Sequence, residues 1–205
     1  MQAYLSATDI IDWQNPNIQQ LAQQLAESNP NAIAKACFEW VRDNIDHSSD
    51  YQKNPVTCRA SEALAHRTGY CFAKSHLLAG LLRANSIPTG FCYQRLSVFD
   101  NGAPYSLHGF NAVYLDRYGW YRIDARGNKS GVNAQFTPPQ EQLAFSINLP
   151  EEIDYQHVLA EPLPQVVQAL LTYHTWDELL HNLPDLEREN FSQRLAEAKI
   201  QWEYH

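Results

Sequence analysis

The sequence predicts an α+β fold in which helices precede an antiparallel sheet and further helices follow it. Between residues 16 and 84, apolar residues recur at helical spacing. Between residues 89 and 123, runs of aromatic and β-branched residues are separated by short turns. From residue 164 onward, helical patterns return. Helices and strands that are segregated along a chain are typical of an α+β fold.

The length and charge of the chain limit what it can be. A chain of 205 residues fits a single domain covering 1–205 and is long enough to bury a sizeable core. Its formal net charge of −8 argues against binding to nucleic acid or anionic membranes, because both attract basic surfaces. No apolar stretch is long enough to span a membrane, and the first residues do not resemble a signal peptide. We therefore expect a cytoplasmic protein with neither nucleic acid nor membrane as a partner.

Asparagine–proline pairs open the first two predicted helices, because Asn is a good helix cap and Pro fits the first helical position. Polar, turn-forming residues at 46–58 indicate an irregular surface loop. The sequence Asn85-Ser86-Ile87-Pro88 stops the helix that begins at Cys71. The predicted helices of this half lie at about 15–26, 32–45, 60–65 and 71–84.

The second half begins with a predicted meander of three strands, at 89–98, 107–115 and 120–123. After Asp124 the pattern indicates an irregular excursion, and residues 140–150 fit an additional edge strand. Three further helical segments are expected at 164–171, 176–183 and 186–198.

Cys71 is distinctive among the four cysteines, which lie at 37, 58, 71 and 92. No two are spaced as Cys-x-x-Cys, so neither a zinc ribbon nor a thioredoxin-like site is indicated. Cys71 begins a helix and shares a helical face with Leu78 and Leu82. Unpaired N–H groups and the helix dipole stabilise an anion at this position, which favours a reactive thiolate. The other three cysteines fit structural roles.

A reactive thiol needs a base, and His108 is better placed for this than the other histidines. His76 lies roughly 140° around the same helix from Cys71, so its side chain cannot reach the thiol face. His108 starts a strand, and Asp124 ends the next one, so the two side chains can meet on one face of a sheet. Because both residues have even numbers, this requires a turn of odd length or a bulge near 115–119.

In this order, the residues and their flanks resemble the transglutaminase-like superfamily, which has a papain-like core, and its small bacterial members in particular. The likeness covers about Ala32 to Asn128. It is carried by Gly69-Tyr70-Cys71, Leu81-Leu82-Arg83-Ala84, Ile87-Pro88, the His108 strand and Gly119-Trp120…Asp124. Two stretches depart from the family pattern, Thr89-Gly90 and Gly109-Phe110-Asn111-Ala112.

The resemblance implies a papain-like core at about 32–128, with N-terminal helices packed on an antiparallel sheet and a helical addition at about 151–205. It also implies that Cys71 is the nucleophile, His108 the general base and then acid, and Asp124 the carboxylate that orients His108.

The implied activity is cysteine-dependent acyl transfer through a thioester, as in an amide hydrolase, a peptidase or a transglutaminase-type acyltransferase. The substrate would be a peptide, a protein or a small amide, with neither cofactor nor metal. The backbone N–H of Cys71 would hold the oxyanion together with a polar side chain, for which Gln52 and Tyr51 are candidates. Two alternatives remain: a non-catalytic protein that binds peptides or proteins in the cleft, and deamidase or N-acetyltransferase chemistry on the same three residues.

Simpler explanations also exist for some of these residues. An isolated cysteine is most often a buried structural residue, and Asp124 could pair with Arg122 or Arg126 rather than with a histidine. His174, Glu178 and His181 could share a helix face as metal ligands, but we expect a solvated amphipathic helix there.

Overall fold

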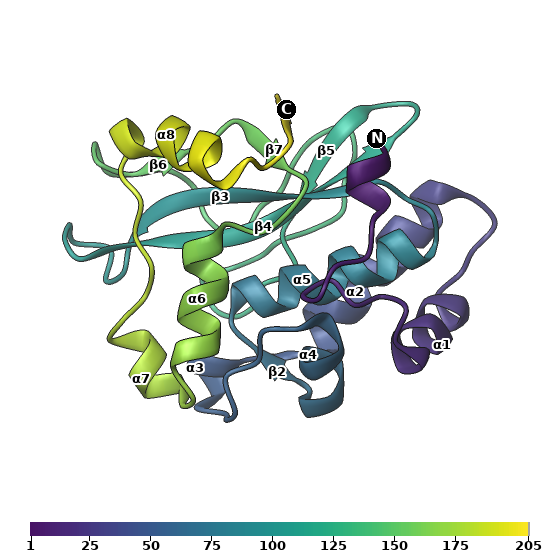
Figure 1. Ribbon diagram of the computed structural model, residues 1–205, viewed down its shortest axis with the longest axis horizontal. Coiled ribbons are helices and arrows are strands. Elements are labelled where there is room, and N and C mark those ends of the chain that lie inside the picture. The colour runs from purple at the N-terminus through teal and green to yellow at the C-terminus, as the bar shows by residue number, and fades with distance from the viewer. Residues whose placement is uncertain (205) are drawn as a thin grey trace.

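The computed structural model describes residues 1–204. Figure 1 shows one sheet with the N-terminal helices packed below it and α6 and α7 at one end. The helices are η1 (Gln2–Leu5), α1 (Pro16–Gln24), α2 (Pro30–Asn44), α3 (Ser48–Tyr51), α4 (Ala60–His66), α5 (Cys71–Ala84), α6 (Pro164–Thr172), α7 (Trp176–Leu180) and α8 (Arg188–Ala198). The strands are β1 (Asp46–His47), β2 (Thr68–Gly69), β3 (Thr89–Ser97), β4 (Tyr105–Leu115), β5 (Gly119–Ile123), β6 (Ile153–Asp154), β7 (His157–Leu159) and β8 (Trp202–Tyr204).

The main sheet has the strand order β5-β4-β3-β7-β8, and β6 also pairs with β3. All of its pairings are antiparallel, whereas β1 and β2 form a separate parallel pair. The predicted meander corresponds to β3, β4 and β5. The predicted α+β class, with N-terminal helices on an antiparallel sheet, is confirmed.

Side-chain caps explain where α1 and α2 begin. The side chain of Asn15 accepts a hydrogen bond from the backbone N–H of Asn17 at 3.0 Å, and that of Asn29 accepts one from Ala32 at 3.0 Å. Each cap is followed by a proline in the first helical turn. Caps of this kind typically contribute about 1 kcal/mol, and the proline has no N–H to leave unpaired.

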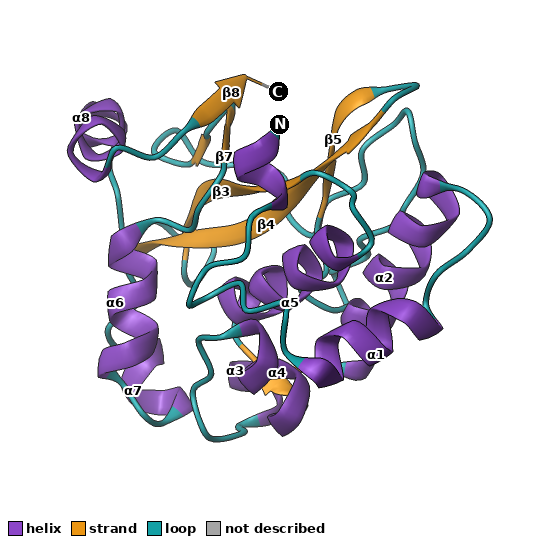
Figure 2. Ribbon diagram, turned by 45° about the vertical axis from the view of Figure 1, so that its right-hand side comes forward, coloured by secondary structure: helices purple, strands orange, loops and turns teal. Residues whose placement is uncertain are grey.

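Helix α5 lies in the middle of the molecule. Figure 2 shows the sheet on one side of it and α1, α2 and α4 around the others. Every residue from Cys71 to Arg83 is buried. The helix is therefore covered on all faces, not only on the stripe that contains Cys71, Leu78 and Leu82, as is typical of a helix in a core.

Gly109 allows α5 to approach β4 closely. A Cβ atom at this position would lie 2.7 Å from Cδ1 of the Phe72 ring, which is too close for a real contact. Two residues further along β4, Nδ2 of Asn111 donates a hydrogen bond to the carbonyl oxygen of Ser75 at 3.1 Å. The glycine therefore lets the first turn of α5 pack closely against the strand that carries His108.

The turn between β4 and β5 has the odd length that the sequence predicted. Leu115 pairs with Gly119, so residues 116–118 form the turn. This register places residues with even numbers on one face of both strands. His108 and Asp124 lie on that face, with Asp124 one residue beyond the end of β5.

Three predicted segments differ from the structure. Within residues 1–204, no strand forms at 140–150, and the added strands are β6, β7 and β8. The C-terminal addition is therefore not purely helical. The segment 46–58 contains β1 and the single-turn α3 in place of a wholly irregular loop. Strands of two or three residues are too short for a periodic pattern, and they form here because distant segments pair with them.

The C-terminal helices share a hydrophobic cluster with the start of α5. Leu170 of α6, Leu179 of α7 and Leu195 of α8 belong to the same buried cluster as Tyr70 and Phe72. Among the described helices, none has both the length and the apolar character to cross a membrane.

Candidate active site

Cys71 is the first residue of α5, as the sequence predicted. Tyr70 occupies the position that precedes the helix, and its phenolic O–H donates a hydrogen bond to the carbonyl oxygen of Trp176. The C-terminal part of the chain thus fixes the residue before the thiol. Cys71 is 8% exposed, and it lies at a helix end where backbone N–H groups have no partner within the helix.

His108, on β4, is hydrogen-bonded to Asp124. Its Nε2 lies 2.7 Å from Oδ2 of Asp124, and both side chains are buried. Because an ionised carboxylate can only accept, Nε2 carries the hydrogen, and Nδ1 of the neutral ring is left as an acceptor. The Phe110 ring stacks on the imidazole with the ring centroids 5.8 Å apart, and the Phe145 ring meets it edge-on with the centroids 5.0 Å apart. The imidazole is therefore held in one orientation.

The protonation of His108 depends on both of its neighbours. Burial would lower the pKa of His108, but electrostatic interactions with Asp124 and Cys71, and hydrogen bonds to both, raise it to about 10. Burial would likewise raise the pKa of Asp124, but the charge and hydrogen bond of His108 hold it below its ordinary value. The structure thus brings Cys71, His108 and Asp124 together, in that order.

Asp124 is also positioned by the backbone. The N–H groups of Arg126 and Ala144 each donate to its carboxylate at 3.1 Å. The guanidinium groups of Arg122 and Arg126 pair with other carboxylates. The simpler explanation, in which Asp124 pairs with one of these arginine side chains, is therefore wrong.

Cys71 and His108 line a single cavity of about 700 Å³. Residues from the β3–β4 end of the sheet and from the segment after Asp124 form much of its wall. Leu180 of α7 and the nearby Leu183 complete the wall. A cavity of this size is in the range that holds small ligands or part of a peptide.

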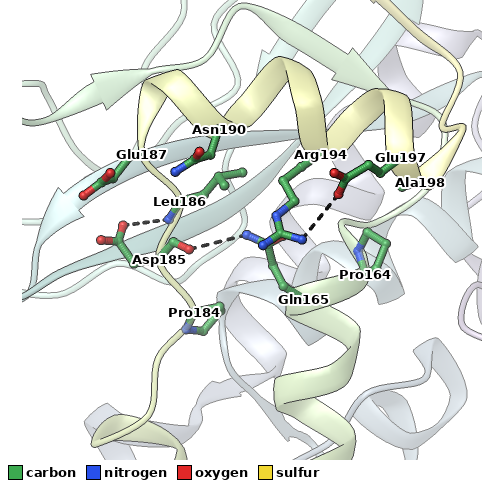
Figure 3. A pocket seen from close by; sticks show the side chains of 10 residues that line it. All are labelled: Pro164, Gln165, Pro184, Asp185, Leu186, Glu187, Asn190, Arg194, Glu197 and Ala198. Atoms are coloured by element: carbon green, nitrogen blue, oxygen red, sulfur yellow. Dashed lines mark hydrogen bonds and ion pairs between the residues drawn. The ribbon is translucent and has the colours of Figure 1, made fainter.

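A second cavity, of about 670 Å³, lies between α6 and α8 (Figure 3). Two pairs of its polar groups bind each other: Arg194 pairs with Glu197 at 3.4 Å, and Nε2 of Gln165 donates to the carbonyl oxygen of Asp185 at 3.4 Å. None of the described residues that line it is a cysteine or a histidine. This cavity offers no nucleophile, so the acyl-transfer hypothesis concerns the first one.

The two predicted oxyanion donors, Tyr51 and Gln52, do not line the cavity of Cys71. Tyr51 is 62% exposed, and Gln52 follows the end of α3 with a left-handed backbone conformation. The single turn of α3 points both side chains to solvent. Two other residues of this segment, His47 and Ser49, line the cavity in their place.

Three other histidines, His76, His174 and His181, lie outside this cavity and are bonded to backbone groups or belong to a helix cap. His76 is buried in α5, with Nδ1 2.7 Å from the carbonyl oxygen of Cys58, away from the thiol. The carboxylate of Glu178 accepts a hydrogen bond from the backbone N–H of His174, so Glu178 helps to cap the start of α7. Nδ1 of His181 lies 2.7 Å from a backbone carbonyl one turn earlier. Within residues 1–204, no group of three or more His, Cys, Asp or Glu side chains is arranged to hold a metal ion.

Comparison with known families identifies the core. Residues 19–125, just over half of the chain, match the model described as the transglutaminase-like superfamily. The chain belongs to this superfamily. The matched segment contains Cys71, His108 and Asp124. No curated protein sequence matches the chain at a significant level.

Two solved structures resemble the fold more distantly. A Cytophaga hutchinsonii protein, provisionally described as a cysteine protease, is 21% identical with a TM-score of 0.48, covering 60% of this chain and 40% of its own. The periplasmic domain of TgpA from Pseudomonas aeruginosa is 22% identical with a TM-score of 0.44, covering 60% of this chain and 46% of its own. This chain therefore spans less than half the length of either protein. The family assignment depends on residues 19–125 alone.

Beyond the superfamily motifs, an ion cluster joins α3 to the segment after Asp124. Asp50 accepts hydrogen bonds from Lys129 at 2.7 Å and from Nη2 of Arg126 at 3.0 Å. Burial would raise the pKa of Asp50, but Arg126 and then Lys129 hold it well below its ordinary value. Sequence reasoning missed this cluster, because its members are far apart in the chain and only folding brings them together.

Lys74, one turn after Cys71, is buried, and within residues 1–204 its hydrogen-bond partners are backbone carbonyls rather than carboxylates. Its Nζ donates to the carbonyl oxygens of Arg42, at 3.3 Å, and Ile45, both at the end of α2. Burial, followed by the charge of Arg126, lowers the pKa of Lys74 to about 7. The helical pattern does not distinguish this lysine from an exposed one, so the sequence contained no signal for it.

Proposed function

We propose that this member of the transglutaminase-like superfamily is a cysteine-dependent acyl-transfer enzyme, with Cys71 as nucleophile, His108 as base and acid, and Asp124 as orienting carboxylate. The observation that carries the proposal is the 2.7 Å bond from His108 Nε2 to Asp124, on a ring whose other side faces Cys71. Members of this superfamily are typically cysteine-dependent enzymes.

The proposed chemistry follows from the tautomer. Nδ1 of His108 takes the thiol proton, and the thiolate attacks the carbonyl carbon of an amide or ester. The backbone N–H of Cys71 stabilises the oxyanion. His108 then gives its proton to the leaving amine. Water or a second amine attacks the thioester and releases the acyl group.

The acyl donor is a peptide, a protein or a small amide, in keeping with a cavity of about 700 Å³. Its wall has apolar side chains such as Leu107 and Leu180 and polar ones such as Ser106 and Asn148. We keep the cytoplasmic location as a prediction, although the Pseudomonas neighbour is a periplasmic domain. Within residues 1–204 all four cysteines are free thiols.

The first test compares the thiols of one molecule. Burial raises the pKa of both Cys37 and Cys58 to about 12, and it also raises the pKa of Cys92. We therefore expect iodoacetamide at pH 7 to modify Cys71 at least about tenfold faster than the other three, as mass spectrometry of the digested protein would measure. Equal rates at Cys71 and Cys92 would contradict the proposal.

The second test measures acyl transfer itself. Cys71→Ser should abolish the burst of nitrophenol from p-nitrophenyl acetate, with a rate loss of about 10³-fold or more. Cys92→Ser is the matched control and should keep the burst, since Cys92 lies outside the cavity. A glutamine-containing peptide offered with a primary amine then separates transfer from hydrolysis and from deamidation. Peptide binding without any turnover that depends on Cys71 would instead favour the non-catalytic binding module.

A further inference from the structure

His47 lies beside the chain that leads into Cys71. Strands β1 and β2 pair in parallel with His47 opposite Gly69, two residues before the thiol. The His47 ring also meets the Tyr70 ring edge-on, with the centroids 5.4 Å apart. His47 thus contacts or pairs with both residues that precede Cys71.

One ring nitrogen of His47 is hydrogen-bonded to a neighbouring side chain, which leaves the other for a group in the cavity. Nδ1 lies 3.0 Å from the hydroxyl oxygen of Ser49, the hydrogen-bond partner of this ring among the described residues. The side chain is buried but lines the same cavity as Cys71 and His108. Because Nδ1 is engaged by Ser49, Nε2 is the ring nitrogen left for a group bound in the cavity.

The two imidazoles of this cavity have opposite electrostatic surroundings. Burial and then the charge of Arg126 push the pKa of His47 well below its ordinary value; Lys74 and His108 add to this, and Asp50 opposes it. The pKa of His108 is raised instead. Two titratable groups whose surroundings shift their pKa values in opposite directions can take different roles in one site. A neutral ring that accepts from Ser49 at Nδ1 carries its hydrogen on Nε2 and can donate it.

We infer that the Nε2–H of His47 is the second donor of the oxyanion hole, beside the backbone N–H of Cys71. This inference depends on the proposed acyl transfer. As the S–C bond forms, the π pair of the carbonyl moves to its oxygen, and the two donors bind the resulting oxyanion. When the pair returns, the bond to the leaving group breaks, and His108 supplies the proton to that group. The hydroxyl groups nearby are engaged, since Tyr70 donates to Trp176 and Ser49 bonds to the ring.

Two probes of the same thiol separate this role from a structural one. Iodoacetamide reacts by displacement at a CH₂ group and forms no oxyanion, whereas p-nitrophenyl acetate acylates Cys71 through a tetrahedral oxyanion. For His47→Phe, which keeps a ring against Tyr70 but has no donor, we expect acylation to slow by about 10²-fold or more. Alkylation of Cys71 should stay within about threefold of the wild-type rate, because that step does not use the donor.

Matched variants complete the experiment. His47→Gln restores a donor, so it should acylate at least about tenfold faster than His47→Phe. His47→Met, also without a donor, repeats the test if the phenylalanine variant does not fold. Gln52→Leu, at an exposed position outside the cavity, should acylate at the wild-type rate.

The outcomes distinguish this inference from the proposed function. If the donor-free variants acylate as fast as wild type, or if both probes slow equally, His47 is not the oxyanion donor. If wild-type protein shows no burst that depends on Cys71, the acyl-transfer proposal fails, and this inference fails with it.

Discussion

Two buried histidines lie at α5, His108 beside its start and His76 in its middle, and their pKa values are shifted in opposite directions. His108, near the start, bonds to Asp124, and its pKa is raised to about 10. His76, in the middle, is hydrogen-bonded to the carbonyl oxygen of Cys58, and burial lowers its pKa to about 4. Both rings are buried, so burial cannot explain the difference. A neighbouring carboxylate reverses the effect that burial has on an imidazole.

Removal of the Asp124 carboxylate should make the electrostatic surroundings of His108 resemble those of His76. With Asp124→Asn, the pKa of His108 should fall from about 10 towards that of His76, because burial remains and the negative charge is lost. The wrong tautomer becomes available to the ring, so single-turnover acylation by p-nitrophenyl acetate should fall by about 10³- to 10⁴-fold. NMR titration of the imidazole and stopped-flow kinetics measure the two effects.

A matched carboxylate provides the control for this change. Asp154 pairs with Arg122 at 2.8 Å in the same sheet but does not line the cavity. Asp154→Asn should therefore leave the acylation rate within about threefold of wild type. An equal loss in both variants would show that the sheet, rather than the charge beside His108, is responsible.

The surroundings of His76 can be tested by measuring the free energy of unfolding at acid pH. His76 is neutral in the folded state down to about pH 4, whereas in the unfolded chain it takes up a proton below about pH 6.5. Between these values the unfolded state binds more protons, so stability falls as the pH is lowered, by about 3 kcal/mol in all. His76→Asn keeps a donor for the Cys58 carbonyl and should lose less stability over this range. Urea unfolding at pH 6.5, 5 and 4 measures the difference.

His66 supplies the control, since it is an exposed histidine at the end of α4. If His66→Asn and His76→Asn change the acid dependence equally, burial at position 76 is not the cause. Acylation of Cys71 should be nearly unchanged in both variants, because neither side chain reaches the cavity.

Lys74 extends the comparison to a buried base that, like His76, is hydrogen-bonded to backbone carbonyl oxygens. Its pKa of about 7 in the folded protein is far below the ordinary value of about 10.4. Above pH 7 the unfolded state binds the extra proton, so this residue makes stability rise with pH, by about 2–3 kcal/mol between pH 7 and 9. Below pH 7 both states are protonated, and the full cost of burial is present. Lys74→Met should lack this rise, as denaturant unfolding across the range would show.

Lys35 on α2 is the matched control for that experiment, because its side chain is largely exposed. Lys35→Met should keep the rise in stability between pH 7 and 9. A rise that persists unchanged in Lys74→Met would mean that another group titrates in this range.

The sequence predicted much of the site because its signals are local. The Asn15 and Asn29 caps, the helix start at Cys71 and the turn before Gly119 each depend on a few adjacent residues. The even numbering of His108 and Asp124 limited the connection to a turn of odd length or a bulge, and the structure has the odd turn. The positions of β7 and β8 were not predictable, since such short strands exist only through partners elsewhere in the chain.

By itself, the sequence determined the class of fold, the helix that presents the thiol, and the histidine and carboxylate that adjoin it. The tertiary structure decided which neighbours those groups have. It turned Tyr51 and Gln52 to solvent and His47 to the cavity, and it placed the buried Lys74 against backbone carbonyl oxygens. The physical reason is that helix caps, turns and strand periodicity act over a few residues. Burial and charge pairing act between segments that meet only in the folded chain.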